Sequence, residues 1–360
     1  MTAREPNGRP PEAPAGGVRA NVQAMRGYVP GEQLNDPDIV KLNTNENPYP
    51  PSPRVFDAVR SALTADGLRK YPQPLGDAFR RAAGRVLGVD PDGILIGNGS
   101  DDILTILTRA FVPEGGRVAS PTPSYTLYRS LAEIQGAEFE TVRFTAAWAL
   151  PDPWPVAGAD LTFLPNPNSP SGTALNPAEL DAFVASAGGP VVLDEAYADF
   201  CDWNGLAVAA RHPRAVVTRS FSKAYSLAGL RIGYAVARTE LVHELLKVKD
   251  SYNCDVLSLA AATAAIEDED YFRGVRAKIV ATRERLHLAL GGLGFAVTPS
   301  HANFLWCRRA DRPVKPLYEQ LKRRKILVRY MNYDGYDGLR ITVGTDVEID
   351  LLLAELAGLL

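Results

Sequence analysis

The sequence predicts an α/β protein with a large domain, built on a mostly parallel sheet that helices cover, and a smaller α+β domain. The 360 residues are 46% apolar, enough for two packed cores. From Arg54 onward, short apolar runs alternate with helical patterns, and near residue 250 the pattern changes to longer helices. Brief apolar strands separated by helices are typical of a parallel sheet that is covered on both faces.

Four parts are expected along the chain: a flexible arm over residues 1–27, a segment over 28–53 that joins the small domain, the large domain over 54–250 and the small domain over 251–360. The arm is rich in Pro, Gly, Ala and Arg and lacks the apolar run of a signal peptide. Prolines over 48–53 exclude a regular helix, so an extended crossing is expected there.

Strands and helices follow from the apolar patterns. In the large domain, strands are expected over 93–97, 117–120, 161–164, 190–193, 215–218 and 233–237. In the small domain, the sequence predicts helices over 258–266 and 271–290 and strands over 303–306 and 339–343.

Charge and cysteine usage exclude several classes of partner. The net charge is -3, and the basic run over 322–325 is interpreted as a solvated helix face, so no nucleic acid is expected to bind. Three separated cysteines form no CxxC pair, which indicates neither a disulfide framework nor a metal site and fits the cytoplasm. No run approaches 18 apolar residues, so no membrane is expected to be a partner.

One lysine stands inside a group of phosphate-binding residues. Lys223 follows an expected strand, with Ser220 and Ser222 before it and Arg231 eight residues after it. A lone lysine after a strand is usually a surface residue. Here, hydroxyls and a guanidinium around one centre suit a phosphate. A lysine beside a phosphate ester indicates a carbonyl cofactor, pyridoxal 5'-phosphate (PLP), held by Lys223 as a Schiff base.

A carboxylate and a phenol stand at the ligand-binding edge of the sheet. Asp194 and Tyr197 directly follow the run 191–193, at the carboxyl end of an expected strand. The aspartate could simply cap a helix. In a PLP site, a carboxylate keeps the pyridine nitrogen protonated. Tyr197 can then offer its hydroxyl to the 3'-oxygen of the ring.

Two further turns offer cofactor contacts. Gly99, Ser100 and Asp101 lie in a glycine-rich turn before a helix expected near Ile103, where free N–H groups bind phosphate, although an ordinary helix cap looks similar. Tyr125 follows a Pro-rich turn and could stack on the pyridine ring.

These segments together resemble the fold-type I PLP-dependent aminotransferases and, within them, the histidinol-phosphate aminotransferase family, from about Tyr28 to the carboxyl terminus. The segments that carry the resemblance are 220–231, 194–197, 42–48, 70–72 and 339–344. The resemblance implies a homodimer in which Tyr71 reaches the cofactor phosphate of the neighbouring subunit. It also implies that Arg329 and Arg340 bind the substrate and that Tyr28 lines its pocket.

One turn departs from the family pattern. The family reads Asn-Asn-Pro-Thr-Gly, and the asparagine before proline contacts the ring oxygen. Here that position is Ser169, and Ser171 replaces the threonine. Asn168 is expected to swing toward the ring and replace this contact, although the Ser169 hydroxyl could make it instead.

The resemblance implies transfer of an amino group from histidinol phosphate to 2-oxoglutarate, a step of histidine biosynthesis. Lys223, displaced by the amino donor, would move the α-proton. Three alternatives stay open: an aromatic amino acid aminotransferase, a threonine-phosphate decarboxylase-like enzyme and a non-catalytic PLP-binding regulator. The regulator would need an added DNA-binding domain, for which the arm is too short.

Overall fold

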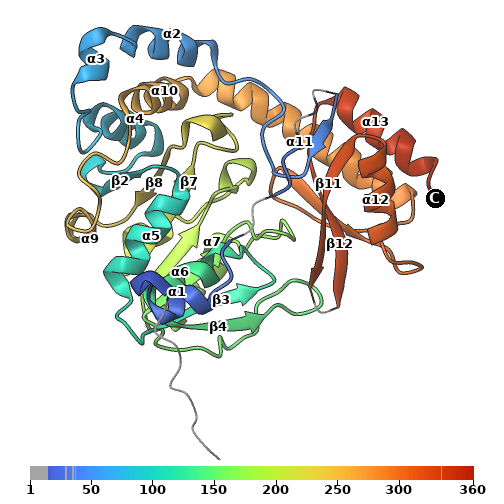
Figure 1. Cartoon of the computed structure of the whole chain (residues 1–360), viewed down its shortest axis with the longest axis horizontal. Coiled ribbons are helices and arrows are strands. Elements are labelled where there is room, and N and C mark those ends of the chain that lie inside the picture. Colours follow the sequence, from blue (N-terminus) through green and yellow to red (C-terminus); the bar gives the residue numbers. More distant parts are fainter. Residues whose placement is uncertain (1–14, 29–30, 35, 37, 334) are drawn as a thin grey trace, which may run out of the picture.

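The computed structural model describes residues 15–28, 31–34, 36, 38–333 and 335–360. Within these residues, strands form a seven-stranded sheet in the order β2-β8-β7-β6-β5-β3-β4 and a five-stranded sheet in the order β1-β11-β12-β10-β9. Figure 1 shows the two sheets side by side, each with its own helices. The expected α/β class, with a large and a small part, is confirmed.

The large sheet is parallel except for β8, which runs antiparallel to both of its neighbours. Its strands are β2 (Ile94–Gly97), β3 (Arg117–Thr122), β4 (Glu138–Arg143), β5 (Leu161–Pro165), β6 (Val191–Asp194), β7 (Ala215–Ser220) and β8 (Gly233–Val236). The six expected strands are confirmed. The strand β4 was not expected, because it is an edge strand whose mostly exposed polar residues give no apolar run.

Helices cover both faces of this sheet. The helices of this part of the chain are α2 (Pro53–Ala62), α3 (Ala65–Arg69), α4 (Asp77–Leu87), α5 (Ser100–Phe111), α6 (Leu127–Gln135), α7 (Pro177–Ser186), α8 (Leu206–Arg211) and α9 (Thr239–Leu245). Successive strand residues point to opposite faces, so Val192 packs in the core under α5 and α6, whereas Leu193 packs under α7 and α8. The carboxyl ends of β5, β6 and β7 remain as the edge where ligands can bind.

The small sheet combines two distant parts of the chain. It contains β1 (Val40–Leu42), β9 (Ala296–Thr298), β10 (Phe304–Arg308), β11 (Ile326–Tyr333) and β12 (Tyr336–Thr342), and its helices are α11 (Glu269–Gly292), α12 (Lys315–Arg323) and α13 (Asp346–Ala357). Because β1 pairs with β11, the amino-terminal segment joins this sheet as expected. The strands expected over 303–306 and 339–343 correspond to β10 and β12.

The helix α10 (Val256–Glu267) packs with the large domain. Its Ala261 and Ala265 lie in one apolar cluster with Phe79 of α4 and Ile94 of β2. A boundary at residue 250 would therefore separate α10 from the helices against which it packs. We propose that the boundary lies at the start of α11, which runs from one body to the other (Figure 1).

Part of the expected flexible arm is docked. Residues 1–14 lie outside the described residues, but α1 (Ala20–Ala24) lies on α6. The Asn21 amide donates to the Glu133 carbonyl oxygen at 2.7 Å. Farther along, the Glu32 carboxylate accepts from the Tyr318 hydroxyl of α12 at 3.2 Å and pairs with Lys322. The chain thus contacts both domains before it enters β1.

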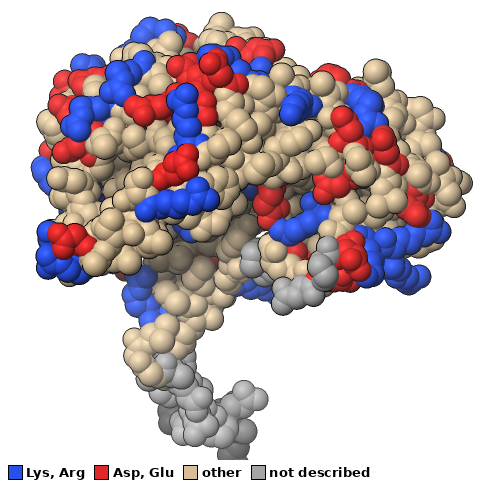
Figure 2. Space-filling view, turned by 90° about the horizontal axis from the view of Figure 1, so that it is seen from above, with Lys and Arg blue, Asp and Glu red and all other residues tan. Residues whose placement is uncertain are grey.

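The surface offers no single-sign field on the face that Figure 2 shows, where lysine and arginine lie interspersed with aspartate and glutamate. In the part of the chain that the structure describes, no helix combines the length and apolarity that a membrane crossing needs.

Candidate active site

A cavity of about 590 Å³ lies between the carboxyl edge of the large sheet and the small sheet. This volume falls in the range of roughly 300–1,000 Å³ that is usual for small-molecule sites. The expected site residues that line the cavity are Tyr28, Ser100, Asp101, Tyr125, Asp194, Tyr197, Ser220, Ser222, Lys223, Arg231, Arg329 and Arg340. Residues far apart in the sequence therefore meet at one place.

At one end of the cavity, an arginine, hydroxyl groups and a helix start lie together, a combination that suits a phosphate. Arg231 has a left-handed backbone (φ 49°), and its Nη1 donates to Ser222 Oγ at 3.1 Å. Gly99 has a φ of 85°, which L side chains rarely adopt, and it packs against the guanidinium, since a Cβ there would stand 2.7 Å from Arg231 Nη2. Helix α5 begins at Ser100, three residues before its expected start. Its unpaired first-turn N–H groups therefore belong to the same site.

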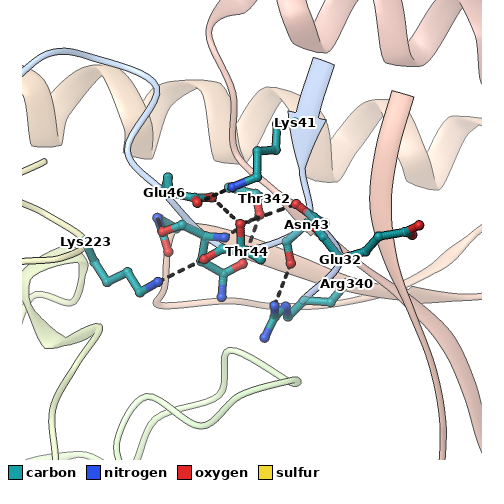
Figure 3. Close-up of polar contacts among 10 residues, drawn as sticks. Glu32, Lys41, Asn43, Thr44, Glu46, Lys223, Arg340 and Thr342 are labelled. Carbon is teal, nitrogen blue, oxygen red and sulfur yellow. Dashed lines mark hydrogen bonds and ion pairs between the residues drawn. The ribbon is translucent and has the colours of Figure 1, made fainter. Parts of the chain in front are cut away.

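The lysine at the centre has an unusual environment. Lys223 Nζ donates to the Thr44 carbonyl oxygen at 2.9 Å (Figure 3). Burial, together with the nearby positive charges of Arg340 and Arg231, lowers the pKa of Lys223 to about 8. The neutral amine, which is the nucleophilic form, is therefore accessible near physiological pH.

The expected cofactor carboxylate is buried and held by hydrogen bonds. Asp194 Oδ2 accepts from the Tyr128 hydroxyl at 2.6 Å, and Oδ1 accepts from Thr218 Oγ1 at 3.2 Å and from the Ala196 N–H at 3.3 Å. Burial raises the pKa of Asp194, and these donors oppose that rise. They favour the ionised carboxylate, which is the form that pairs with a protonated ring nitrogen.

Tyr128, which donates to Asp194, was not among the expected site residues. It lies in the first turn of α6, fully buried, with its ring stacked on Phe163 at 4.6 Å between centroids. Its ring also meets that of Tyr125 edge-on at 5.5 Å. No local spacing indicated this role, because Tyr125 precedes α6 and the contact of Tyr128 with Asp194 joins positions 66 residues apart.

The phenol groups around the cavity each have a defined partner. The Tyr197 hydroxyl accepts from Asn45 Nδ2 at 2.9 Å. The Tyr125 hydroxyl donates to Asp101 Oδ1 at 3.1 Å, and its ring meets that of Tyr28 edge-on at 5.7 Å. Tyr125 therefore stands between the phosphate end of the cavity and the amino-terminal segment that carries Tyr28.

Two arginines mark the other end of the cavity. Arg329 and Arg340 stand directly opposite each other on β11 and β12. Arg340 Nη2 donates to the Asn43 carbonyl oxygen at 2.8 Å (Figure 3), and Nη1 donates to Ser169 Oγ at 2.9 Å. Among the described residues, neither guanidinium forms an ion pair with a carboxylate; Glu32, whose field reaches Arg329, pairs with Lys322 instead. Like charges directly opposite each other are unfavourable without an anion.

The structure corrects one expectation in the turn after β5. Asn168 does not swing toward the cavity: its Nδ2 donates to Ser171 Oγ at 2.9 Å and to the Pro123 carbonyl oxygen at 3.3 Å. The Asn168 Nδ2 group is thus taken up by these two acceptors, whereas its Oδ1 atom is buried without a partner among the described residues. Ser169 lines the cavity instead, and we propose that its hydroxyl occupies the position of the missing family asparagine.

Tyr71 lies away from the cavity of its own chain. It is 80% exposed, and its ring stacks on Tyr252 at 4.4 Å between centroids. Its contact with a cofactor phosphate therefore depends on a second subunit and stays a prediction.

The residues present fit PLP. The phosphate end, the lysine and the buried carboxylate lie around one cavity, and Gly99 leaves the close approach that a phosphate needs. In addition, Ser124 Oγ is buried at the cavity without a hydrogen-bond partner among the described residues, so a donor remains for a ligand.

Tyr128→Phe should weaken the equilibrium affinity for PLP by about tenfold, because it removes a hydrogen bond to a charged group but keeps the stacked ring. Loss of a donor also raises the pKa of Asp194. When the pH is lowered, the variant should therefore lose its affinity for PLP at a higher pH than the unmutated protein does. Fluorescence titration of the apoprotein measures both effects. Tyr318→Phe, on α12, is the matched control; equal affinity in Tyr128→Phe would contradict this role.

Comparison with known proteins agrees with the site. Residues 37–356 match the model of the family Aminotransferase class I and II. A histidinol-phosphate aminotransferase of Rhodopirellula baltica is 48% identical over 345 residues, which cover 94% of this chain and 95% of the relative. A histidinol-phosphate aminotransferase of Geotalea daltonii is 42% identical over 341 residues, which cover 94% of this chain and 98% of the relative. The crystal structure of histidinol-phosphate aminotransferase from Sinorhizobium meliloti in complex with pyridoxal-5'-phosphate is similar, with a TM-score of 0.86 and 26% identity over 95% of this chain and 98% of that one. The chain therefore belongs to the class I and II aminotransferases, which are PLP-dependent enzymes, and within them to the histidinol-phosphate aminotransferase family.

Proposed function

We propose that this protein transfers the amino group of histidinol phosphate to 2-oxoglutarate. The observation that carries the proposal is the pair Arg329 and Arg340, opposite each other at the cavity and without a carboxylate partner among the described residues. A phosphate monoester brings nearly two negative charges and three acceptor oxygens, which two guanidinium groups can share. The carboxylate of 2-oxoglutarate can use the same arginines in the second half-reaction.

The alternatives fit these residues less well. An aromatic amino acid has no charge on its side chain to bind Arg329. A threonine-phosphate decarboxylase-like enzyme would also use the arginine pair, but curated relatives at 42–48% identity are named histidinol-phosphate aminotransferases. The aromatic wall of Tyr28, Tyr125 and Tyr333 further suits a flat imidazole ring.

The side chains divide the reaction among them. When bound, PLP supplies an electron sink for the carbon that loses its proton. The free amine of Lys223 would move that proton, and its lowered pKa suits the task. Asp194 keeps the ring nitrogen protonated, and the Tyr197 hydroxyl donates to the ring oxygen. Arg231, Ser220 and Ser222 hold the phosphate and thereby fix the ring.

We also propose a homodimer with shared sites. Tyr71 is exposed and remote from its own cavity, and apolar side chains on α2, on α3 and between them are exposed near it in the sequence: Phe56, Leu63 and Leu68. Exposed apolar groups of this size often mark a subunit interface. Tyr71 would then complete the phosphate end of the partner's site.

A cytoplasmic location is part of the proposal. Cys201, Cys254 and Cys307 are all free and buried. Free thiols of this kind suit a reducing compartment.

Borohydride reduction of the holoenzyme should fix the cofactor on Lys223 and remove the visible absorbance. Peptide mass mapping identifies the labelled lysine, and Lys223→Ala should lose both the label and turnover. Lys247→Ala, at an exposed site on the surface, is the control. A label on any other lysine would contradict the assignment.

Arg329→Ala should reduce kcat/KM for histidinol phosphate. The reduction should correspond to a loss of about 2 kcal/mol of transition-state stabilisation, the scale of one hydrogen bond to a charged group. The half-reaction with 2-oxoglutarate should suffer less, because Arg340 remains. Single-turnover kinetics separates the two half-reactions, and Arg323→Ala, an exposed arginine on α12, controls for loss of charge alone. If phenylalanine or tyrosine were the better donor and Arg329→Ala kept that activity, the aromatic alternative would replace this proposal.

Mixing Lys223→Ala with Tyr71→Ala should restore activity, since heterodimers contain one interface with an intact set of residues. Steady-state turnover after subunit exchange measures the recovery, and each variant alone is the control. No recovery, with exchange shown by mass spectrometry, would argue against a contact across the interface.

A further inference from the structure

Consecutive residues of the amino-terminal crossing segment contact the groups that carry the chemistry. The Asn43 carbonyl oxygen accepts from Arg340, and the Thr44 carbonyl oxygen accepts from Lys223 (Figure 3). The next residue, Asn45, uses its side chain: Nδ2 donates to the Tyr197 hydroxyl at 2.9 Å. One short segment after β1 thus contacts a substrate-binding residue of the small domain and two residues of the large domain.

The orientation of the Asn45 amide is determined by its other contacts. Thr342 Oγ1 donates to Asn45 Oδ1 at 2.9 Å and accepts from the Asn45 backbone N–H at 3.0 Å. Asn303 Nδ2 donates to the Asn45 carbonyl oxygen at 3.0 Å. Because Oδ1 already accepts from Thr342, the amide nitrogen is the atom that faces Tyr197. Asn45 is 1% exposed, so water does not compete for these bonds.

This contact decides what the Tyr197 hydroxyl can do. A phenol has one hydrogen to donate and lone pairs that accept. Since Asn45 has no acceptor facing it, the hydroxyl must accept from the amide, and its own hydrogen points elsewhere. Tyr197 lines the cavity, so the acceptor for this hydrogen is a group of the bound ligand.

The turn after β5 supplies no equivalent amide. Asn168 Nδ2 donates to Ser171 and to the Pro123 carbonyl oxygen, and the Ser169 hydroxyl accepts from Arg340. Asn45 is therefore the asparagine that acts on the ring-oxygen side of the cavity, one step removed from the ligand.

We propose that Asn45 is a positioning residue, which fixes the direction in which Tyr197 donates its hydroxyl hydrogen and, through Thr342, ties Tyr197 to the strand that carries Arg340. Thr342 and Arg340 lie two residues apart on β12. An anion held by Arg340 is thereby linked to the phenol at the cofactor ring. The inference rests on the proposed function in one respect, that Tyr197 donates to the ring oxygen of PLP.

The test is a pH titration of the visible absorbance of the holoenzyme. Asn45→Gly removes the amide and tolerates the left-handed backbone (φ 58°). Without it, the Tyr197 hydroxyl can rotate and stabilises the charged ring oxygen less, so the lysine-linked nitrogen holds its proton more strongly. The pH at the midpoint of the absorbance change should rise by roughly half a pH unit to one pH unit, which is the scale of one neutral hydrogen bond.

Asn43→Ala is the matched control. Asn43 is also an asparagine that is 1% exposed, but its amide donates to the Glu32 carbonyl oxygen rather than to Tyr197. This variant should keep the midpoint of the unmutated enzyme. The same shift in Asn43→Ala as in Asn45→Gly would overturn the proposal, because a general disturbance of the segment would then explain both.

A double variant shows whether the effect passes through Tyr197. Tyr197→Phe alone should raise the midpoint, and Asn45→Gly should add nothing in that background. A full additional shift, or no shift in Asn45→Gly alone, would overturn the role of Asn45 and leave the proposed function intact. A Tyr197→Phe variant with an unchanged midpoint would overturn the assigned role of Tyr197 and this inference with it.

Asn45→Asp is the second variant if Asn45→Gly fails to fold, because aspartate keeps the acceptor for Thr342 and tolerates the backbone conformation. Its carboxylate can only accept, so it would take the Tyr197 hydrogen from the ring oxygen. The midpoint should therefore rise more with Tyr197 present than in the Tyr197→Phe background. Equal rises in both backgrounds would mean that the new charge acts directly, and would overturn the proposal.

Discussion

A buried arginine beneath the cavity holds together the two loops that carry the chemistry. Arg219, on β7, pairs with Glu195 at 2.8 Å and with Asp199 at 2.7 Å. Glu195 adjoins Asp194, and Arg219 adjoins Ser220, so this cluster fixes the ends of β6 and β7 relative to each other. Breaking a buried ion pair by removal of one partner is strongly destabilising, because an uncompensated charge remains. The distance between the Asp194 carboxylate and the Lys223 amine therefore depends on this ion-pair cluster.

The same cluster connects the two domains. Arg276, on α11, donates from Nε to the Asp199 carbonyl oxygen at 2.8 Å and from Nη2 to the Cys201 carbonyl oxygen at 3.0 Å. Burial raises the pKa of Asp199, and the charge of Arg219 opposes that rise and favours the ion. Helix α11 is thus attached to the segment that directly follows Asp194 and Tyr197.

The sequence predicted those features that depend on local spacing. The alternation of apolar runs with helical patterns is sufficient to place the strands along the chain. Ser220, Ser222 and Lys223 lie so close in sequence that one turn brings them together. Contacts between distant segments were not predictable in this way: Tyr128 meets Asp194 across 66 positions, and Asn45 meets Tyr197 across 152. Such contacts depend on how strands order within a sheet and how the domains meet, which no local pattern specifies.

The arginine pair also makes the stability of the fold depend on the solution. Arg329 and Arg340 repel each other across β11 and β12, and any anion that binds between them binds only the folded chain. Binding to the native state alone adds RT ln(1 + [L]/Kd) to the free energy of unfolding. The free energy of unfolding should therefore depend on the buffer: an anion that binds between the two arginines, such as phosphate, would stabilise the fold more than an anion that binds weakly.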